Sequence, residues 1–362
     1  MVNKKIGTLL LAGTMVMSMG TTVFAADGLN QAGTKDNPAT VSVTKNLEFA
    51  EGISIPDSSF DFTASKIESV TQDAPKATIN SIRYTDHEKI GKLENGKYVL
   101  SKTSEITFGQ FPHAGEYQYK VKETTGKMQG MAYDANEYTL KVYVANADNN
   151  ELYIKMITAS EEGKNEKPDN LLFTNTYRKR GGEDAGDNVD SLVIRKDIKG
   201  ELADKTKEFK FELTFTKAAT TPATDTQLTG KIGDQEINFT YDQAQTFTLS
   251  DGDELRFQNI PAGTRYKVTE LGKADGYKPS VKVIENGVAN TERTGNDADS
   301  VSSADDSNLI GENENKVTFT NTNDATPVTG IIAKNAPIII VVALGVLGML
   351  GYALIKRKIE KR

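Results

Sequence analysis

The hydrophobic and polar residues of this chain follow a pattern that occurs twice. In each copy, three short stretches place two apolar residues two positions apart and add a polar residue two positions later. Because residues i, i+2 and i+4 of a β-strand share one face, each polar residue should point into the core with its apolar neighbours. The stretches are residues 41–45, 119–123 and 171–175 in the first copy, and 192–196, 266–270 and 317–321 in the second.

The rest of the chain also has the pattern of β-structure. Short runs rich in valine, isoleucine, threonine, tyrosine and phenylalanine alternate with turn signals, and no amphipathic helix longer than two turns is predicted. Pairing of the first strand with the last in each copy predicts an all-β fold of two tandem immunoglobulin-like sandwiches. We expect domain 1 at residues 26–178, a linker or short hinge at 179–190, and domain 2 at 191–325. Long loops are expected at residues 216–230 and 291–315.

The six polar residues of the pattern are costly to bury alone, because they lose water on entering a core. A single strand that ends in lysine or asparagine is ordinary, since such side chains often reach solvent. Two ordered sets in the same phase instead indicate that the members of each set meet and satisfy one another. The sets are Lys45, Glu123 and Asn175 in the first copy, and Lys196, Glu270 and Asn321 in the second.

These residue types can form an amide crosslink by themselves. Burial lowers the pKa of a lysine and raises that of a glutamic acid, so a neutral amine can lie beside a protonated carboxyl. The amine can attack the asparagine side-chain carbonyl, while the glutamic acid polarises that carbonyl and passes protons to the departing ammonia. Because folding brings the groups together, we expect no cofactor and no enzymatic activity beyond this self-crosslinking.

Composition excludes several other function classes. The chain has 362 residues, a formal net charge of −7 and no cysteine, so disulfides, thiolate nucleophiles and zinc–thiolate sites are absent. The sequence has no stripe of basic residues, so nucleic acid is not expected as a partner. His87 and His113 are not spaced as metal ligands, and we expect no metal site. A secreted hydrolase is disfavoured, because no nucleophile–base pair occurs in a recognisable setting.

With these residues in place, both segments resemble the isopeptide-linked domains of streptococcal-type backbone pilins of Gram-positive bacteria. The resemblance implies that Lys45 bonds Asn175 with Glu123 as catalyst, and that Lys196 bonds Asn321 with Glu270 as catalyst. Residues 260–270, followed by Gly276 and Tyr277, also resemble the B-type (CnaB-like) repeats of collagen-adhesin stalks. Those repeats are likewise isopeptide-linked sandwiches.

The N-terminal residues have the pattern of a secretory signal peptide. Lys4 and Lys5 precede an apolar stretch, and small or aliphatic residues lie at positions −3 and −1 of a cleavage site after Ala25. We therefore expect a signal peptide at residues 1–25, with cleavage after Ala26 as the alternative.

The C-terminal residues have the three parts of a sorting signal. An apolar run at residues 336–355 is long enough to span a bilayer, and a basic tail at 356–362 would hold it on the cytoplasmic side. Alone, these parts would predict a plain membrane anchor. The pentapeptide in front of them resembles the sortase motif LPXTG, with threonine where leucine is usual, and the resemblance implies cleavage between Thr329 and Gly330. The pentapeptide is Thr326, Pro327, Val328, Thr329 and Gly330.

Taken together, the resemblance implies a backbone pilin that sortase polymerises into a covalent fibre on the cell wall. The expected partners are sortase, neighbouring subunits, peptidoglycan and minor pilins at the tip or base. The resemblance also places the acceptor lysine in the loop before the last strand of domain 1, where Lys167 and then Lys164 are the candidates. The alternative is a wall-anchored monomeric adhesin, stalk protein or minor pilin built from the same domains.

Overall fold

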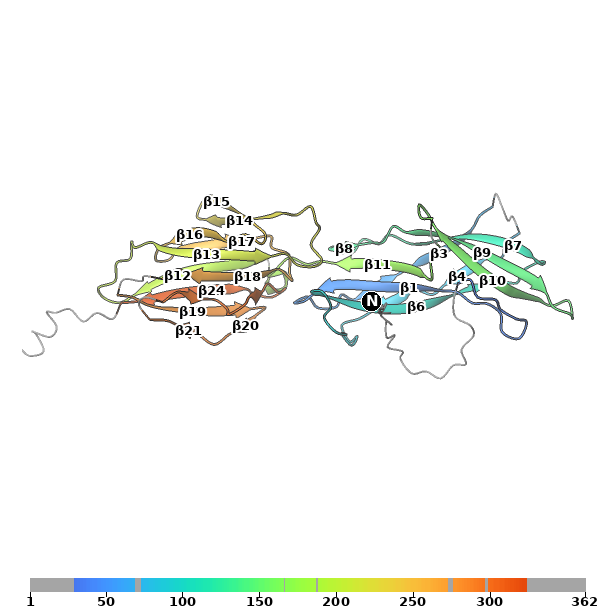
Figure 1. The fold of residues 1–362 in the computed structure, drawn as a ribbon, viewed down its shortest axis with the longest axis horizontal. Coiled ribbons are helices and arrows are strands. Elements are labelled where there is room, and N and C mark those ends of the chain that lie inside the picture. The colour runs from blue at the N-terminus through green and yellow to red at the C-terminus, as the bar shows by residue number, and fades with distance from the viewer. Residues whose placement is uncertain are drawn as a thin grey trace, which may run out of the picture.

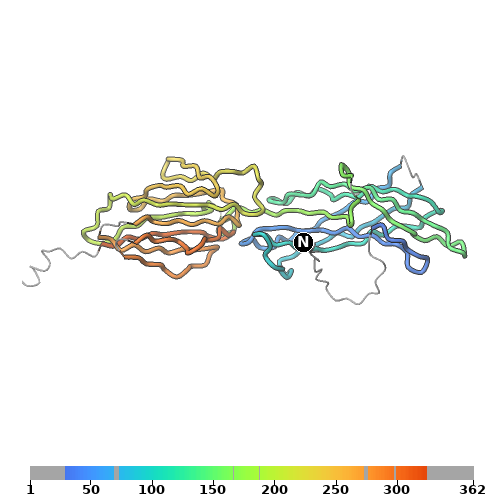
Figure 2. The backbone as a smooth tube through the Cα atoms, viewed as in Figure 1, coloured from blue at the N-terminus to red at the C-terminus, as the bar shows by residue number. Residues whose placement is uncertain are grey.

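In a computed structural model, the chain is described at residues 29–68, 73–165, 167–186, 188–272, 276–296 and 299–323. The predicted signal peptide and the predicted sorting signal lie outside these residues. Among the helices of the described ranges, none has the length and apolar character needed to cross a membrane. Figure 1 shows two β-sandwiches arranged end to end along the long axis, and Figure 2 shows how the backbone runs through both bodies.

The first sandwich confirms the all-β prediction for the N-terminal half. One sheet has the strand order β4-β6-β1-β11-β8, and the sheet facing it has the order β10-β9-β7-β3. A separate pair is formed by β2 and β5. The strands are β1 (Ser42–Ala50), β2 (Ser58–Phe60), β3 (Phe62–Lys66), β4 (Ala77–Ile79), β5 (Ile82–Tyr84), β6 (Lys97–Phe108), β7 (Gly115–Glu123), β8 (Met131–Ala132), β9 (Glu137–Asn146), β10 (Leu152–Glu161) and β11 (Leu171–Tyr177).

The second sandwich repeats the plan with different edge strands. Its larger sheet has the order β15-β14-β17-β12-β24-β19-β20, with β21 also paired to β19, and its smaller sheet has the order β16-β13-β18-β22, with β23 paired to β18. The strands are β12 (Leu192–Lys199), β13 (Phe209–Thr216), β14 (Gln227–Ile232), β15 (Gln235–Thr240), β16 (Gln245–Leu249), β17 (Glu254–Phe257), β18 (Arg265–Glu270), β19 (Lys278–Glu285), β20 (Val288–Ala289), β21 (Arg293–Thr294), β22 (Val301–Ser302), β23 (Asn308–Leu309) and β24 (Lys316–Thr322).

The alternation of apolar and polar residues produces these strands, because every second side chain of a half-buried strand faces the core. Strand β11 alternates buried and half-buried residues along its whole length. Aromatic rings then join the facing sheets: Phe173 of β11 lies 5.3 Å from the rings of both Phe62 and Tyr138. In the second sandwich, Phe319 of β24 lies 5.1 Å from Phe211 of β13. Such aromatic pairs add to the stabilisation that burial alone provides.

Of the segment 179–190, expected as a linker or hinge, the described residues 179–186 and 188–190 are held against the second sandwich. The N–H of Gly181 donates to the carbonyl of Ile260 at 2.7 Å, and the N–H of Gly182 donates to the carbonyl of Gly311 at 3.0 Å. Gly182 has φ of 71°, a left-handed conformation that favours glycine. A short 3₁₀ turn, η1 (Glu183–Ala185), follows it. The segment therefore has little freedom to act as a flexible hinge.

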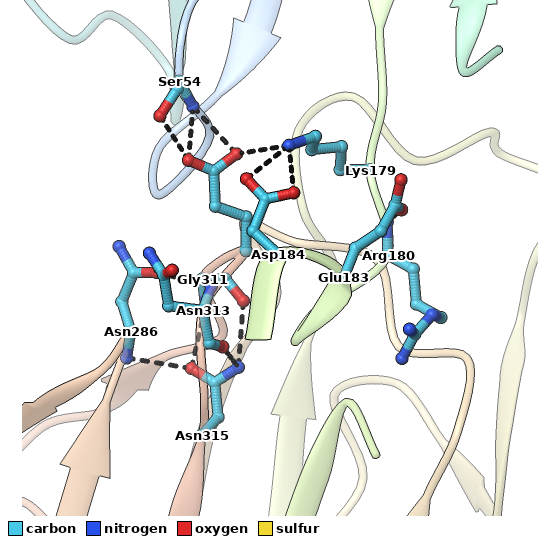
Figure 3. A network of polar contacts seen from close by, with 10 residues as sticks. Ser54, Lys179, Arg180, Glu183, Asp184, Asn286, Gly311, Asn313 and Asn315 are labelled. Atoms are coloured by element: carbon cyan, nitrogen blue, oxygen red, sulfur yellow. Dashed lines mark hydrogen bonds and ion pairs between the residues drawn. The ribbon is translucent and has the colours of Figure 1, made fainter. Parts of the chain in front are cut away.

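A buried carboxylate connects the two sandwiches across this junction (Figure 3). Glu312, in the second sandwich, accepts bonds of 3.1 Å from the main-chain N–H of Ser54, in the first. The N–H of Glu312 in turn donates to the carbonyl of Gly52 at 3.0 Å. Lys179 contacts the same carboxylate at 3.1 Å and Asp184 at 2.6 Å. These contacts hold the two bodies in one relative position.

The expectation of two long loops in domain 2 is wrong in part. Strand β14 begins at Gln227, inside the stretch 216–230, and β21, β22 and β23 all lie inside 291–315. The second stretch also carries buried polar residues, including Asn308, Glu312 and Asn315. The side-chain amide of Asn315 donates to the main-chain carbonyls of three residues, Ser191, Gly311 and Asn313. Side-chain bonds to the main chain thus order a stretch that has few apolar residues.

Candidate functional site

The first site lies between the first and last strands of the N-terminal sandwich. Strands β1 and β11 are parallel neighbours, and their register pairs Leu47 with Asn175. Lys45 lies two residues before Leu47, so its side chain shares the core-facing side with that of Asn175. Glu123 ends β7, on the facing sheet. The topology therefore brings one residue from each of the three predicted strands to one point in the core.

Glu123 bridges the other two side chains of this site. Lys45 Nζ donates to Glu123 Oε2 at 2.7 Å, and Asn175 Nδ2 donates to Glu123 Oε1 at 2.6 Å. Lys45 and Asn175 have no exposed surface, and Glu123 is 5% exposed. The predicted triad is thus in contact and is separated from bulk water.

Burial moves both ionisable groups of the first site toward their neutral forms. Desolvation lowers the pKa of Lys45 and outweighs the opposing effect of its bond to Glu123. Desolvation likewise raises the pKa of Glu123. The ring of Phe60, whose centroid lies 4.7 Å from Lys45 Nζ, forms part of the apolar wall around the amine. A neutral amine beside a protonated carboxyl is the state in which lysine is a nucleophile.

The amide of Asn175 has a second partner that the sequence pattern did not indicate. The main-chain N–H of Asp134 donates to Asn175 Oδ1 at 2.8 Å. Glu123 thus contacts the amide nitrogen, whereas we had expected it to polarise the carbonyl. Asp134 lies in the segment between β8 and β9, where no period-two pattern exists to mark it. The sequence therefore carries no signal for this contact.

The second site repeats this geometry in the C-terminal sandwich. Strands β12 and β24 are parallel, and Ile198 pairs with Asn321, so that Lys196 again lies two residues before the partner of the asparagine. Lys196 Nζ donates to Glu270 Oε2 at 2.9 Å, and Asn321 Nδ2 donates to Glu270 Oε1 at 2.5 Å. Lys196 and Asn321 are fully buried, and Glu270 is 3% exposed.

Two features of the second site affect its chemistry. Burial lowers the pKa of Lys196 to about 8, and its amine lies 4.2 Å from the ring centroid of Phe209. Asn321 Oδ1 is buried and has no hydrogen-bond partner among the described residues. The lysine amine thus has a lowered pKa, as in the first site, whereas the asparagine carbonyl oxygen lacks the hydrogen bond that it has there.

The other predicted functional residues lie away from these sites. Lys164 and Lys167 are exposed in the loop between β10 and β11, where Lys164 pairs with Glu161 at 2.5 Å. His113 lies on the surface beside Asp73, at 2.7 Å, and His87 lies beside Asp86 at 3.4 Å. The five residues of the predicted sortase motif, 326–330, lie outside the described residues.

Family models match both halves of the chain. Residues 41–178 match a Spy0128-like isopeptide containing domain (FctA). Residues 190–323 match a domain of unknown function, DUF7601. The two matches lie on the two sandwiches, and each range contains one of the two triads.

The chain is also similar to curated relatives and to a solved structure. The chain is 28% identical over 363 residues to a pilin of Streptococcus pyogenes serotype M1, which covers 96% of this chain and 97% of the relative. It is 38% identical over 90 residues to the pilus tip adhesin Cpa of Streptococcus pyogenes, covering 25% of this chain and 12% of the adhesin. The solved major pilin protein T3.2 of Streptococcus pyogenes matches at 23% identity and a TM-score of 0.37, over 79% of this chain and 98% of that one.

Proposed function

Since this chain is a pilin of the streptococcal type, with a Spy0128-like isopeptide containing domain at residues 41–178, we propose that it forms the shaft of a covalent surface pilus. We further propose that each of its sandwiches is closed by a Lys–Asn isopeptide bond. The observation that carries the proposal is the repeated buried triad, which joins the first and last strands of both domains.

The geometry supports a simple route to the bond. In the neutral pair, the Lys45 amine attacks Cγ of Asn175, the C–Nδ2 bond breaks, and ammonia leaves. Glu123 gives its proton to the leaving nitrogen and recovers one from the lysine nitrogen, so it is unchanged at the end. Lys196, Glu270 and Asn321 take the same roles in the second domain. Each reaction releases one ammonia and leaves no net charge behind.

The proposed bonds would stabilise domains that have no disulfide. Each closes a loop of about 130 residues, for which the chain-entropy model of covalent loops gives about 4–5 kcal/mol. The bonds also connect the first and last strands of each domain. They would therefore resist protease attack and pulling force at the point where a sandwich otherwise opens.

Assembly requires a donor and an acceptor at accessible positions. We propose that sortase cuts between Thr329 and Gly330 and transfers the acyl group of Thr329 to Lys167 or, failing that, to Lys164. Both lysines are exposed in the same loop, where an enzyme can approach from solvent. Lys45 and Lys196 are fully buried and cannot serve as acceptors. The final product would be anchored to peptidoglycan at the cell surface, with tip or base pilins as further partners.

Co-expression with the neighbouring sortase tests this assembly. The full chain should form a ladder of species that survives boiling in detergent, and Lys167→Ala or Lys164→Ala should reduce it to monomer with wall attachment retained. Lys141, on β9, has a side chain that is 43% exposed and supplies the control, because Lys141→Ala should leave the ladder intact. A ladder unchanged in the Lys164 and Lys167 double variant would assign the acceptor elsewhere. Absence of any ladder with the correct sortase would favour the monomeric, wall-anchored alternative.

A further inference from the structure

We propose that the main-chain N–H of Asp134 is the oxyanion donor of the first crosslinking site, and that the Asp134 carboxylate holds this N–H in position. The inference rests on the proposed function, because it adds a catalytic group to the same Lys–Asn reaction. Its consequence is that the two domains close at different rates, the first faster than the second.

The contact with Asp134 determines how the Asn175 amide is oriented. A main-chain N–H can only donate a hydrogen bond, so the atom that it faces, at 2.8 Å, is the carbonyl oxygen. The amide nitrogen then faces Glu123, at 2.6 Å. Each of the three reacting atoms therefore has a partner. The lysine nitrogen and the leaving amide nitrogen contact the Glu123 carboxyl, and the carbonyl oxygen contacts the Asp134 N–H.

Interruption of a strand makes this N–H available. Strand β8 pairs with β11 only at Met131 and Ala132, and beyond Ala132 the chain leaves the sheet. The Asp134 carboxylate then accepts the N–H of Thr174, on β11, at 2.6 Å and the N–H of Asn136 at 2.7 Å. The side chain of Asp134 thus takes the place of a backbone carbonyl beside β11. Its own N–H is left free to bond the side chain of Asn175.

The position of this N–H matches the place where charge develops. When the Lys45 amine adds to Cγ of Asn175, the carbonyl electrons move onto Oδ1, which becomes an oxyanion. A fixed donor in a site without water stabilises that oxyanion more than the neutral carbonyl. When the intermediate collapses, the C=O re-forms, the C–Nδ2 bond breaks, and ammonia leaves with the proton from Glu123. The product carbonyl remains bonded to the Asp134 N–H.

Among the residues that the structure describes, none supplies an equivalent donor to the second site. There β19 stays in the ladder opposite β24, from Lys278 paired with Thr322 to Ile284 paired with Lys316. Ser280, which pairs with Thr320 as Asp134 lies beside Thr174, stays in this ladder, and Pro279, which pairs with Asn321 itself, has no N–H. This agrees with the buried Asn321 Oδ1, which lacks a partner among the described residues. The same reaction must therefore proceed in the second domain without this stabilisation.

Cell-free synthesis of the full chain allows both bonds to be timed in one molecule. Samples are quenched in acid and denaturant at intervals and digested, and the linked and unlinked peptides of each domain are counted by mass spectrometry. In the unchanged chain the first bond should appear before the second. Asp134→Pro, which removes the N–H, should slow the first bond by roughly a hundredfold, the usual effect of losing one oxyanion donor, and leave the second unchanged.

Two further variants separate catalysis from folding. Asp134→Ala keeps the N–H but loses the bonds to Thr174 and Asn136, and should slow the first bond by a smaller factor while domain 1 still resists trypsin. Asp148→Pro is the matched control, because Asp148 follows Ala147 in a turn closed by the Asn150 N–H, a position where proline is favoured. This control should leave both rates unchanged.

Each result has a defined meaning. Slowing of the first bond alone in the Pro variant, with a smaller slowing in a folded Ala variant, supports the inference. A first bond that forms at the unchanged rate in the Pro variant overturns it, as does equal slowing by Asp148→Pro. If neither bond forms in the unchanged chain, the proposed function itself fails, and this inference fails with it.

Discussion

At the residue scale, the number of carboxylates that contact a lysine determines whether its pKa is lowered or raised. Lys45 and Lys196 each have one partner carboxyl in the core, and desolvation lowers the pKa of both. At Lys179, desolvation acts in the same direction but is outweighed by hydrogen bonds to Asp184 and Glu312, so its pKa is raised. Lys179 is therefore an ammonium ion in an ion-pair network, whereas the two core lysines are suited to act as nucleophiles.

The lowered pKa of Lys196 predicts a pH dependence in a chain that cannot form the second bond. In Asn321→Ala the amine stays free, with a pKa of about 8 in the folded state and 10.5 when unfolded. Between these values the unfolded state binds more protons, so the free energy of unfolding of domain 2 should rise with pH, by up to about 3 kcal/mol. Below about pH 8 both states are protonated, and this contribution should be constant.

Urea unfolding at pH 7.5 and at pH 10 measures this effect. The double variant Lys196→Met with Asn321→Ala is the control, because it has the same cavity at residue 321 but no titrating amine. The rise in stability should be present in the single variant and absent in the double variant. Equal pH dependence in both would show that Lys196 does not titrate as the buried geometry requires.

At the scale of elements, the parallel pairing of first and last strands is what makes each triad possible. In both domains the lysine pairs with a phenylalanine, Phe173 or Phe319, that lies two residues before the asparagine. The same register in two sandwiches with different edge strands places the same three side chains in contact. The strands, their inward faces and both triads follow from period-two patterning, which a sequence displays directly.

What the sequence does not display are the contacts made by turns and loops. Asp134 acts through its main-chain N–H, which lies where a strand is interrupted, and Glu312 acts through its carboxylate, which accepts the main-chain N–H of Ser54. The scarcity of apolar residues predicts a long loop at 291–315, yet buried polar side chains such as Asn315 bond the main chain there. Propensity and periodicity report burial along one element, and they carry no information about bonds between distant loops.

The junction between the domains gives a prediction about Glu312. Glu312→Ala would leave the Ser54 N–H without its acceptor and would remove one of the two carboxylates from Lys179. Hydrogen bonds to charged groups contribute about 1.5–3 kcal/mol, so the junction should loosen while both sandwiches stay folded. Small-angle X-ray scattering should show a broader distribution of lengths, and trypsin should cut more quickly near Lys179.

Glu314→Ala is the matched control for this prediction, because Glu314 is exposed two residues away from Glu312. This variant should give the same distribution of lengths in scattering and the same rate of trypsin cleavage near Lys179 as the unchanged chain. If Glu312→Ala behaves in the same way as this control, the remaining contacts, such as that between Arg265 and Glu51 at 2.5 Å, suffice to hold the junction.

At the scale of the whole molecule, the two bonds have different mechanical roles in the proposed fibre. With Lys167 as acceptor, tension enters just before β11, passes along β11 into the junction, and continues into β12 (Figure 1). In domain 2 the force crosses from Lys196 to Asn321 and leaves through the C-terminal segment, so the bond shields the strands between them. In domain 1 the bond instead ties the loaded β11 to β1 and keeps the rest of the sandwich attached to the shaft.

The central claim is that both triads have reacted, and the mass of the intact chain tests it most directly. Each Lys–Asn bond releases one ammonia, so the folded two-domain chain should weigh about 34 Da less than its sequence. Glu123→Ala and Glu270→Ala should each leave the other bond intact and show a deficit of about 17 Da, because the two sites react independently. A mass equal to that of the uncrosslinked sequence would contradict the account.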